Sequence, residues 1–406
     1  MAAGARVGEP APATLSADEA LTIRMRALLL TPPQLSSKPA AKRASKSASK
    51  PASKPAAKCE DAAALVRWFG AMQAQDLGSL QWSLGLRLGL TLPEVDAELE
   101  RGTALRTWPM RGTIHLVPAE DAAWMVRVLG ERPLADAARR REFLELSLAD
   151  ADRAAALLGE ALTGGGRLTR AQCLAVLEAG GLSASGQRGY HLLWYASQRG
   201  VTCIAPNVDG EQTFVLLDEW VTERAGGARK LSRDEALADL ALRYFQSHGP
   251  AARKDFAGWA GLAAKDAKAA IADCGDVLET VSVDGIEMTA SAAALDGARD
   301  SEHRKEAGPQ WLALSGFDEY LLGYKDRSFM VDSDGMKAVI PGGNGVFRST
   351  LVRHGQVAAT WKRTLAAKTV TVEVTWLQRA TQRERTAAEA ALQLYADFMG
   401  RDLRVR

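Results

Sequence analysis

Three polar residues in close succession, Gln73, Gln75 and Asp76, are the first candidates for chemistry in this 406-residue chain. Residues two positions apart face opposite ways on a helix, about 200° apart, but the same way in extended backbone, so the glutamines can act together only if the preceding helix ends near Met72. Glutamine is no strong base, but its carbonyl oxygen can hold a water and its amide can donate. The alternative is structural: the glutamines pair with backbone groups, and Asp76 caps the following helix.

Further polar candidates lie in the stretch MRGTIHL, at Arg111 and His115. Arg111 could contact a phosphate or flank the site. His115 alternates with Thr113 along one face of an expected strand. That face either points into a cleft or holds a hydrogen-bonded histidine in the core, and the sequence leaves both alternatives open.

Charged residues of the second half are candidates for DNA contact. Arg188, His191 and Arg199 lie on or just after an expected helix at 187–198, which would enter a groove of DNA or present a solvated polar face. Lys325 and Arg327 belong to the polar stretch FDEYLLGYKDRS, and Lys337 to a glycine-rich loop at 331–345 that is either a hairpin probing DNA or a surface loop.

The same polar stretch contains paired carboxylates, Asp318 and Glu319. Neighbouring carboxylates can perform acid and base catalysis. They can equally form an internal ion-pair network that fixes the β-rich module against the third winged-helix unit, and we favour this structural interpretation.

Composition excludes several classes of protein. With 51 basic and 49 acidic residues the net charge is +2, and 47% hydrophobic residues can form a large core, which excludes a wholly disordered chain. The sequence has no long uncharged apolar run and no apolar signal core, so we expect a cytoplasmic, nucleoid-associated protein without a membrane span. The four cysteines are far apart, and no metal or other cofactor is expected. No motif typical of NTPases, serine hydrolases or zinc proteases is present.

A basic low-complexity segment at 31–60 interrupts the chain. It has one acid, Glu60, and seven basic residues: Lys38, Lys42, Arg43, Lys46, Lys50, Lys54 and Lys58. Recurring proline and the lack of large apolar residues predict a disordered tether. The tether either holds DNA phosphates without sequence preference or is a solubilising insertion with no further role.

The order of expected elements repeats along the chain. Helices followed by a β-hairpin are predicted three times, with hairpins at 104–117, 201–220 and 277–290, the last turning at Asp284 and Gly285. This pattern predicts an α+β protein of three tandem winged helix-turn-helix units followed by a C-terminal β-rich module and a final helix at 382–399. The expected boundaries are 1–148, 149–230, 231–308 and 309–406.

Several segments together resemble the AlkZ/YcaQ-type winged-helix DNA glycosylases. They are GAMQAQDLGSLQWSLGLR (70–87), LRTWPMRGTIHLVPAEDAAWM (105–125), SGQRGYHLLWYASQRGV (185–201), RYFQSHGPAARKDFAGWAGL (243–262) and LSGFDEYLLGYKDRS (314–328). The resemblance places Gln73, Ala74 and Gln75 at the family's catalytic motif, in its two-glutamine form rather than the glutamine and aspartate form. It implies a DNA glycosylase that excises alkylated bases from double-stranded DNA and that could unhook interstrand crosslinks. Because no poised lysine nucleophile is evident, we expect a monofunctional enzyme that uses water, and two glutamines without a proton donor favour cationic N-alkylated purines of the N7-alkylguanine type. We expect a monomer.

Two other functions fit a winged-helix fold, because a fold alone does not determine function. The first is a non-catalytic DNA-binding protein, such as a regulator or a lesion sensor. The second is a protein-interaction module. Release of free base from alkylated DNA distinguishes the enzyme from both, and salt-dependent affinity for DNA distinguishes the first alternative from the second.

Overall fold

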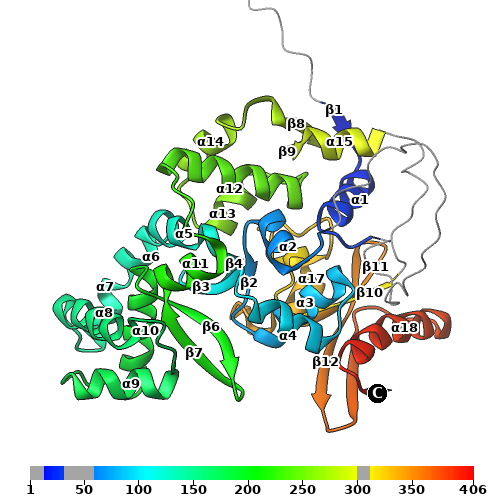
Figure 1. Cartoon of the computed structure of the whole chain (residues 1–406). Coiled ribbons are helices and arrows are strands. Elements are labelled where there is room, and N and C mark those ends of the chain that lie inside the picture. Colours follow the sequence, from blue (N-terminus) through cyan, green and yellow to red (C-terminus); the bar gives the residue numbers. More distant parts are fainter. Residues whose placement is uncertain (1–12, 32–58, 300–310) are drawn as a thin grey trace, which may run out of the picture.

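The computed structural model describes residues 13–31, 59–299 and 311–406 (Figure 1). The tether expected at 31–60 therefore lies outside the described residues, apart from its ends. Helices and strands are mixed, as expected for the α+β class, and the strands form sheets of three, five and six strands. No helix in the described ranges is long and apolar enough to cross a membrane.

The first group of elements matches the expected helices and hairpin. It contains α2 (Ala62–Phe69), β2 (Met72–Gln73), α3 (Leu77–Leu88), α4 (Leu92–Glu100), β3 (Ala104–Met110) and β4 (Thr113–Pro118). Aspartates start two of the helices: the Asp61 carboxylate accepts from the Ala64 N–H at 2.7 Å, and that of Asp76 accepts from the Ser79 N–H at 2.6 Å. Such caps satisfy amide groups that a helix start leaves without partners.

The second group begins after three helices that the sequence analysis did not predict, α5 (Ala122–Leu129), α6 (Glu131–Asp136) and α7 (Ala138–Phe143). It contains α8 (Leu148–Leu162), β5 (Leu168–Thr169), α9 (Arg170–Ala179), α10 (Gln187–Gln198), β6 (Thr202–Val208), β7 (Glu211–Leu216) and α11 (Leu217–Ala225). The prediction that the second hairpin extends through Trp220 was wrong. Strand β7 ends at Leu216, and the next residues start α11, whose apolar side is buried at Leu217, Trp220 and Val221 with helical spacing.

The first two hairpins join in one antiparallel sheet of order β2-β4-β3-β6-β7-β5. Arg106 of β3 pairs with Ile204 of β6, so hairpins that are distant in sequence become neighbours. Strand β2, which carries Gln73, lies at one edge of this sheet against β4. The sheet thus fixes the glutamine motif relative to elements of both groups.

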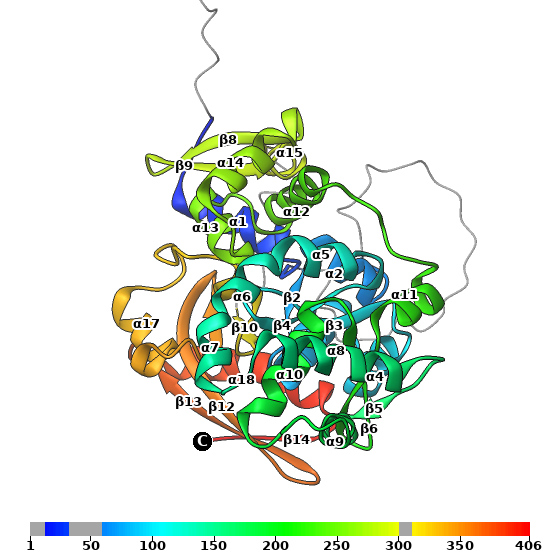
Figure 2. The ribbon, with the colours of Figure 1, turned by 90° about the vertical axis from the view of Figure 1, so that its left-hand side faces the viewer.

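The third group contains α12 (Arg233–His248), α13 (Arg253–Ala260), α14 (Ala264–Ala272), β8 (Leu278–Val283), β9 (Ile286–Ser291) and α15 (Ala292–Arg299). The predicted turn between β8 and β9 is confirmed, because Asp284 and Gly285 both have positive φ, 46° and 79°. Strand β1 (Ala13–Leu15) pairs in parallel with β8, and α1 (Ala17–Ala27) contacts α12 and α15. The N-terminal elements therefore pack with the third group, at the top of both views (Figures 1 and 2).

The C-terminal part forms a sheet of order β10-β11-β12-β13-β14. Its elements are β10 (Trp311–Leu314), α16 (Glu319–Leu322), α17 (Ser333–Val339), β11 (Ser349–Arg353), β12 (Gln356–Leu365), β13 (Thr369–Trp376), α18 (Gln382–Phe398) and β14 (Asp402–Val405). A hairpin was one expectation for 331–345, and it was wrong: this stretch forms α17, capped by Asp332, whose carboxylate accepts from the Gly335 N–H at 2.7 Å. Helix α18 packs against β10 (Figure 1).

Candidate active site

The glutamine motif lies in extended backbone. Helix α2 ends at Phe69, and Gly70 turns the chain with a φ of 83°. Met72 and Gln73 then pair with Leu116 and His115 of β4, and the Ala74 N–H continues this pairing to the Ile114 carbonyl at 2.9 Å. The helix thus ends where a joint action of the two glutamines requires it to end.

Backbone amides fix the orientation of both glutamine side chains. The Gln73 Oε1 accepts from the Gln75 N–H at 3.1 Å, and the Gln75 Oε1 accepts from the Ile114 N–H at 3.2 Å. A backbone N–H can only donate, so each side chain presents its carbonyl oxygen to the backbone. Each oxygen keeps a second lone pair that can hold a water. Gln73 is buried and Gln75 is exposed, so Gln75 is the member that a substrate can reach.

Gln75 lines a cavity of about 260 Å³. The sequence analysis did not single out the other side chains that give this cavity its character: Arg106, Trp108, Arg170 and Tyr190. They come from β3, α9 and α10, so no local sequence pattern could have brought them together. Aromatic rings beside guanidinium groups suit a nucleic acid, whose bases stack and whose phosphates are anionic.

Arg106 stays cationic although it is buried. Burial lowers its pKa to about 10, which leaves the guanidinium protonated at neutral pH. It donates to the Asn207 side-chain oxygen at 2.8 Å and to the Ala205 carbonyl at 3.3 Å, and both acceptors are neutral. Its positive charge is therefore not neutralised by these partners and remains available to a phosphate at the cavity.

The buried carboxylate of Glu319 binds the backbone of strand β2, which carries Gln73. Glu319 accepts from the Gln73 backbone N–H at 3.2 Å, from the Trp259 indole N–H at 3.0 Å and from His248 Nε2 at 3.3 Å. Burial raises the pKa of Glu319, but the His248 interaction and the Gln73 N–H lower it more, so it lies below the usual value. This carboxylate is ionised, buried and fully hydrogen-bonded, which makes it an anchor rather than a proton donor.

Asp318 is part of a second buried anchor. Its two oxygens accept from the two terminal guanidinium nitrogens of Arg87, each at 2.9 Å, and one also accepts from the Ser83 hydroxyl at 2.8 Å. Burial raises the pKa of Asp318, but the Arg87 charge and hydrogen bonds lower it further, so the net shift is downward. Glu319 contacts His248 and Trp259 of the third group, as the structural interpretation expected, whereas Asp318 ties the C-terminal module to α3 of the first group instead.

We expect Asp318→Asn to lower the free energy of unfolding by about 3–5 kcal/mol, because it leaves the buried Arg87 guanidinium without a counter-charge. Asp334→Asn is the matched control. Asp334 pairs with Lys337 at 2.8 Å on the surface, where an ion pair contributes about 0–1 kcal/mol. Urea denaturation of the three proteins measures both effects, and equal stabilities of the two variants would contradict the assignment.

Asp76 and His115 are held in structural contacts. Asp76 caps α3, the alternative that the sequence favoured, and lies 3.7 Å from the Arg363 guanidinium. His115 is wholly buried opposite Gln73, so its polar face does not point into an open cleft. Its Nδ1 donates to the Thr113 carbonyl at 3.0 Å, which leaves Nε2 to accept from Arg111 at 3.2 Å. Burial and the Arg111 charge lower the pKa of His115 to about 3, so the imidazole is neutral.

The depressed pKa of His115 predicts a pH dependence of stability. Between the ordinary value of 6.5 and about 3, the unfolded chain binds a proton at this residue and the folded chain does not. Stability should therefore fall as the pH decreases below about 6.5, by up to about 1.4 kcal/mol per pH unit for this group. Urea denaturation at several pH values should show a smaller slope for His115→Gln, while a variant of the exposed His354 keeps the wild-type slope.

The expected DNA-contact residues are dispersed. Arg188 donates to the Glu145 carbonyl at 3.2 Å, and Arg199 pairs with Asp152 at 3.0 Å. Helix α10 is buried from His191 to Gln198, so the prediction that it presents an extended polar face was wrong. Its apolar residues fill the core between α8 and the sheet, as its contacts with α8 and β3 show.

The C-terminal candidates are also apart from the motif strand. Lys325 has an exposed side chain, and Lys337 pairs with Asp334 on the surface. Arg327 donates to the Leu321 carbonyl at 2.6 Å and packs over the Phe347 ring.

Of the candidate residues, the structure brings together Gln73, Gln75, Arg111 and His115, which lie on or just after β2, on β4 and at the β3–β4 turn. Within the described residues, no group of three or more histidine, cysteine or acidic side chains is placed to hold a metal ion.

Comparison with known proteins identifies the family of this chain. The family model described as DNA glycosylase AlkZ-like matches residues 66–398, a range that includes the glutamine motif and both anchors. The chain belongs to the AlkZ-like DNA glycosylase family. The resemblance predicted from the sequence and the enzyme class of DNA glycosylase are thereby confirmed.

Both a curated protein sequence and a solved structure from Streptomyces sahachiroi are similar to this chain. The chain is 25% identical over 317 residues to an interstrand DNA cross-link repair glycosylase, covering 72% of this chain and 79% of that protein. It also resembles the solved structure of the DNA glycosylase AlkZ, with a TM-score of 0.71 and 20% identity, over 97% of this chain and all of that one (100%). The structural likeness shows the shared fold.

Proposed function

We propose that this AlkZ-like glycosylase is monofunctional and excises N-alkylated purines of the N7-alkylguanine type, with Gln73 and Gln75 positioning the attacking water. The observation that carries the proposal is the exposed Gln75, oriented by the Ile114 N–H at the edge of a cationic and aromatic cavity. Gln73 lies beside it in the same extended backbone, and its side-chain oxygen accepts a hydrogen bond from the Gln75 backbone N–H.

The chemistry follows from the charge of the lesion. An N7-alkylguanine is already cationic, so it leaves the sugar as a neutral base and needs no proton donor. The remaining requirements are a positioned water and dipoles that oppose positive charge developing on the sugar, which amide oxygens supply. None of the described residues lining the cavity is a lysine that could attack the sugar, which supports water as the nucleophile.

We infer that the substrate is double-stranded DNA and that an interstrand crosslink through N7 positions is accepted. Such a crosslink consists of two cationic leaving groups in the major groove, where N7 of guanine is accessible. The printed function of the Streptomyces sahachiroi relative, cross-link repair, supports this extension.

We propose that the duplex is held by three tandem winged-helix units followed by the C-terminal module. The second unit would begin at residue 149, the third at 231 and the C-terminal module at 309. In each of the three groups, helices precede an antiparallel hairpin: β3 with β4, β6 with β7, and β8 with β9. Helix α1 of the proposed first unit also contacts α12 and α15 of the third.

A duplex containing one N7-methylguanine tests the proposed function. After incubation at neutral pH, we expect free 7-methylguanine and an intact strand that breaks only on treatment with alkali, as a monofunctional enzyme leaves an abasic site. Borohydride should trap no covalent complex. A gel shift without base release would instead support a non-catalytic lesion sensor. In such a protein, the hydrogen bonds from backbone N–H groups to the two glutamine side-chain oxygens would have a structural role only.

Deleting residues 36–54 tests the role of the basic tether, which we propose holds DNA phosphates. The deletion removes six basic residues. Each lost phosphate contact lowers the slope of log K against log salt by about 0.9, so a decrease of up to about 5 is expected. A variant of full length with the six residues changed to Ser separates charge from length and should behave like the deletion. An unchanged slope would assign the segment to a solubilising role.

A further inference from the structure

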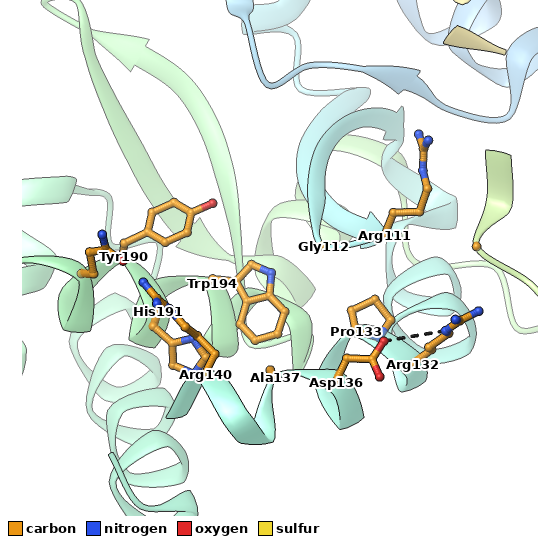
Figure 3. Close-up of a pocket in the computed structure, with 12 residues that line it drawn as sticks. Arg111, Gly112, Arg132, Pro133, Asp136, Ala137, Arg140, Tyr190, His191 and Trp194 are labelled. Atoms are coloured by element: carbon orange, nitrogen blue, oxygen red, sulfur yellow. Dashed lines mark ion pairs between the residues drawn. The ribbon is translucent and has the colours of Figure 1, made fainter. Parts of the chain in front are cut away.

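A second and larger cavity, of about 570 Å³, lies next to the candidate active site. Figure 3 shows its walls: the β3–β4 turn at Arg111 and Gly112, helices α6 and α7, and the first half of α10. Cavities of this size hold small organic ligands. Its lining includes His191 but no other residue that the sequence analysis proposed for DNA contact.

Tyr190 is the wall between the two cavities. It lines both of them, and its ring packs edge-on against Trp108 of the Gln75 cavity, with the ring centroids 6.4 Å apart. At 41% exposure it is one of the large hydrophobic side chains that remain accessible. Arg170 lies over the same ring at 5.9 Å and steadies it from the Gln75 side. A ligand in the larger cavity would therefore be a close neighbour of a substrate at Gln75.

His191 supplies a polar atom that has no partner. The side chain is buried, with 6% exposure, and its Nε2 makes no hydrogen bond with any described residue. This nitrogen exposes less than 1 Å² of surface, so it lies beneath the cavity wall, and His191 contributes its ring to the lining rather than a hydrogen bond to a ligand. Burial and the charges of Arg141 and Arg140 lower the pKa of His191 to about 4, so the free nitrogen belongs to a neutral imidazole.

Flat rings and polar edges face the interior of the cavity. The His191 and Trp194 rings pack together with centroids 5.3 Å apart and an interplanar angle of 31°. The indole nitrogen of Trp194 and the hydroxyl of Tyr190 point into the cavity, whereas the Arg111 guanidinium points away from it, toward His115 (Figure 3). The site thus offers a stacking surface together with hydrogen-bonding groups at its edge, a combination that fits a nucleobase.

One cation at the rim remains available to a phosphate. Arg132 is engaged with Asp136 at 3.7 Å, but Arg140 is exposed and contacts the Phe143 ring, a neutral partner, at 5.0 Å. A guanidinium that has no acidic partner in the described part of the chain suits the phosphate of a nucleotide. The cavity therefore combines the two recognition elements of a nucleotide, one for the base and one for the phosphate.

We propose that this cavity binds one unstacked nucleobase of the DNA strand beside the lesion, with the base against His191 and Trp194 and its phosphate at Arg140. The inference rests on the proposed function in one respect, that DNA is the substrate. The excised base is engaged at Gln75, and the second cavity holds its neighbour across Tyr190. This arrangement would keep the strand open during attack by water.

Calorimetric titration of the full-length protein with 2′-deoxyadenosine 5′-monophosphate tests the site. We expect binding by the wild type, weakened about 2- to 10-fold by Tyr190→Ala, because the change removes the hydroxyl at the edge of the cavity and one hydrogen bond contributes about 0.5–1.5 kcal/mol. Arg140→Ala should weaken it about 5-fold or more, because a hydrogen bond to a charged group is lost. His191→Phe keeps a ring in the cavity wall and should bind nearly as the wild type does. Arg139→Ala, an exposed arginine of the same helix outside the lining, is the matched control and should bind as the wild type does.

A probe without a base completes the test. Deoxyribose 5-phosphate should not compete with the nucleotide, and equal binding of the two would overturn the nucleobase part of the proposal. Nucleotide binding that is unchanged in Tyr190→Ala and Arg140→Ala would overturn the site itself. Base release from the N7-methylguanine duplex is measured in parallel: a wild type that releases base but binds no nucleotide contradicts this inference alone, and one that binds nucleotide but releases no base contradicts the proposed glycosylase activity alone.

Discussion

A duplex with N7-methylguanine should lose its modified base about 10²–10⁴ times faster than a duplex with uracil loses uracil, because that is the range that a general acid contributes to a reaction. Expelling uracil requires stabilisation of an anionic leaving group, usually by a proton donor. The cavity at Gln75 offers amides and guanidinium groups, and a guanidinium does not release its proton at neutral pH. The hydroxyl of Tyr190, which lines the cavity as well, points into the neighbouring cavity (Figure 3). The cationic base needs no such help.

The test of this preference is a panel of duplexes scored for base release at neutral pH. N7-Methylguanine, 3-methyladenine and an N7–N7 crosslink carry cationic bases and should be processed, and uracil should be processed poorly. Uracil released as fast as N7-methylguanine would require an acid near the sugar. The buried carboxylates do not fit that role, since Glu319 and Asp318 are both held ionised by buried partners.

Replacing Gln75 should separate the contributions of its two polar atoms. Gln75→Ala removes both and should slow base release by about 10²–10³-fold, the usual cost of losing one group that stabilises a transition state. Gln75→Glu should keep the rate within about tenfold of the wild type. One carboxylate oxygen can still accept the Ile114 N–H, and the other can hold the water.

The rate of base release should depend on pH in the Gln75→Glu variant but not in the wild type. Glutamine does not titrate, so the wild-type rate should be flat from pH 6 to 9. The Glu variant should lose activity as the pH falls through the pKa of the new carboxyl group, since the protonated form no longer assists the water. Gln81→Ala is the matched control, because Gln81 lies on α3 outside the Gln75 cavity and should leave the rate unchanged. A Glu variant as slow as the Ala variant would assign the essential role to the amide nitrogen.

Local signals predicted most of the elements. Helix α10 has the predicted bounds, and the Asp284 and Gly285 turn connects the expected strands. Apolar periodicity and caps act within a few residues, so they can be recognised in a single sequence. The error at α11 arose because an apolar run of this length fits either a strand or the start of a helix.

The site was only partly predictable, for a physical reason. The extended conformation of Gln73 and Gln75 follows from a helix that ends at Gly70, which is a local signal. In contrast, Glu319 accepts a hydrogen bond from Gln73, which lies 246 positions earlier in the chain. Tyr190 lines the Gln75 cavity from helix α10, which is also distant in sequence. Such contacts are set by packing between groups of elements, and the pairing of β3 with β6 that creates the cavity leaves no trace in local periodicity.

The most direct test of the central claim, that the two glutamines carry the chemistry, is a single-turnover measurement of N7-methylguanine release with the enzyme in excess. The double variant Gln73→Ala, Gln75→Ala is compared with the wild type, and the DNA affinity and thermal stability of both proteins are measured as well. The account predicts release at least about 10²-fold slower with nearly unchanged DNA affinity. Release by the double variant at the wild-type rate would contradict it.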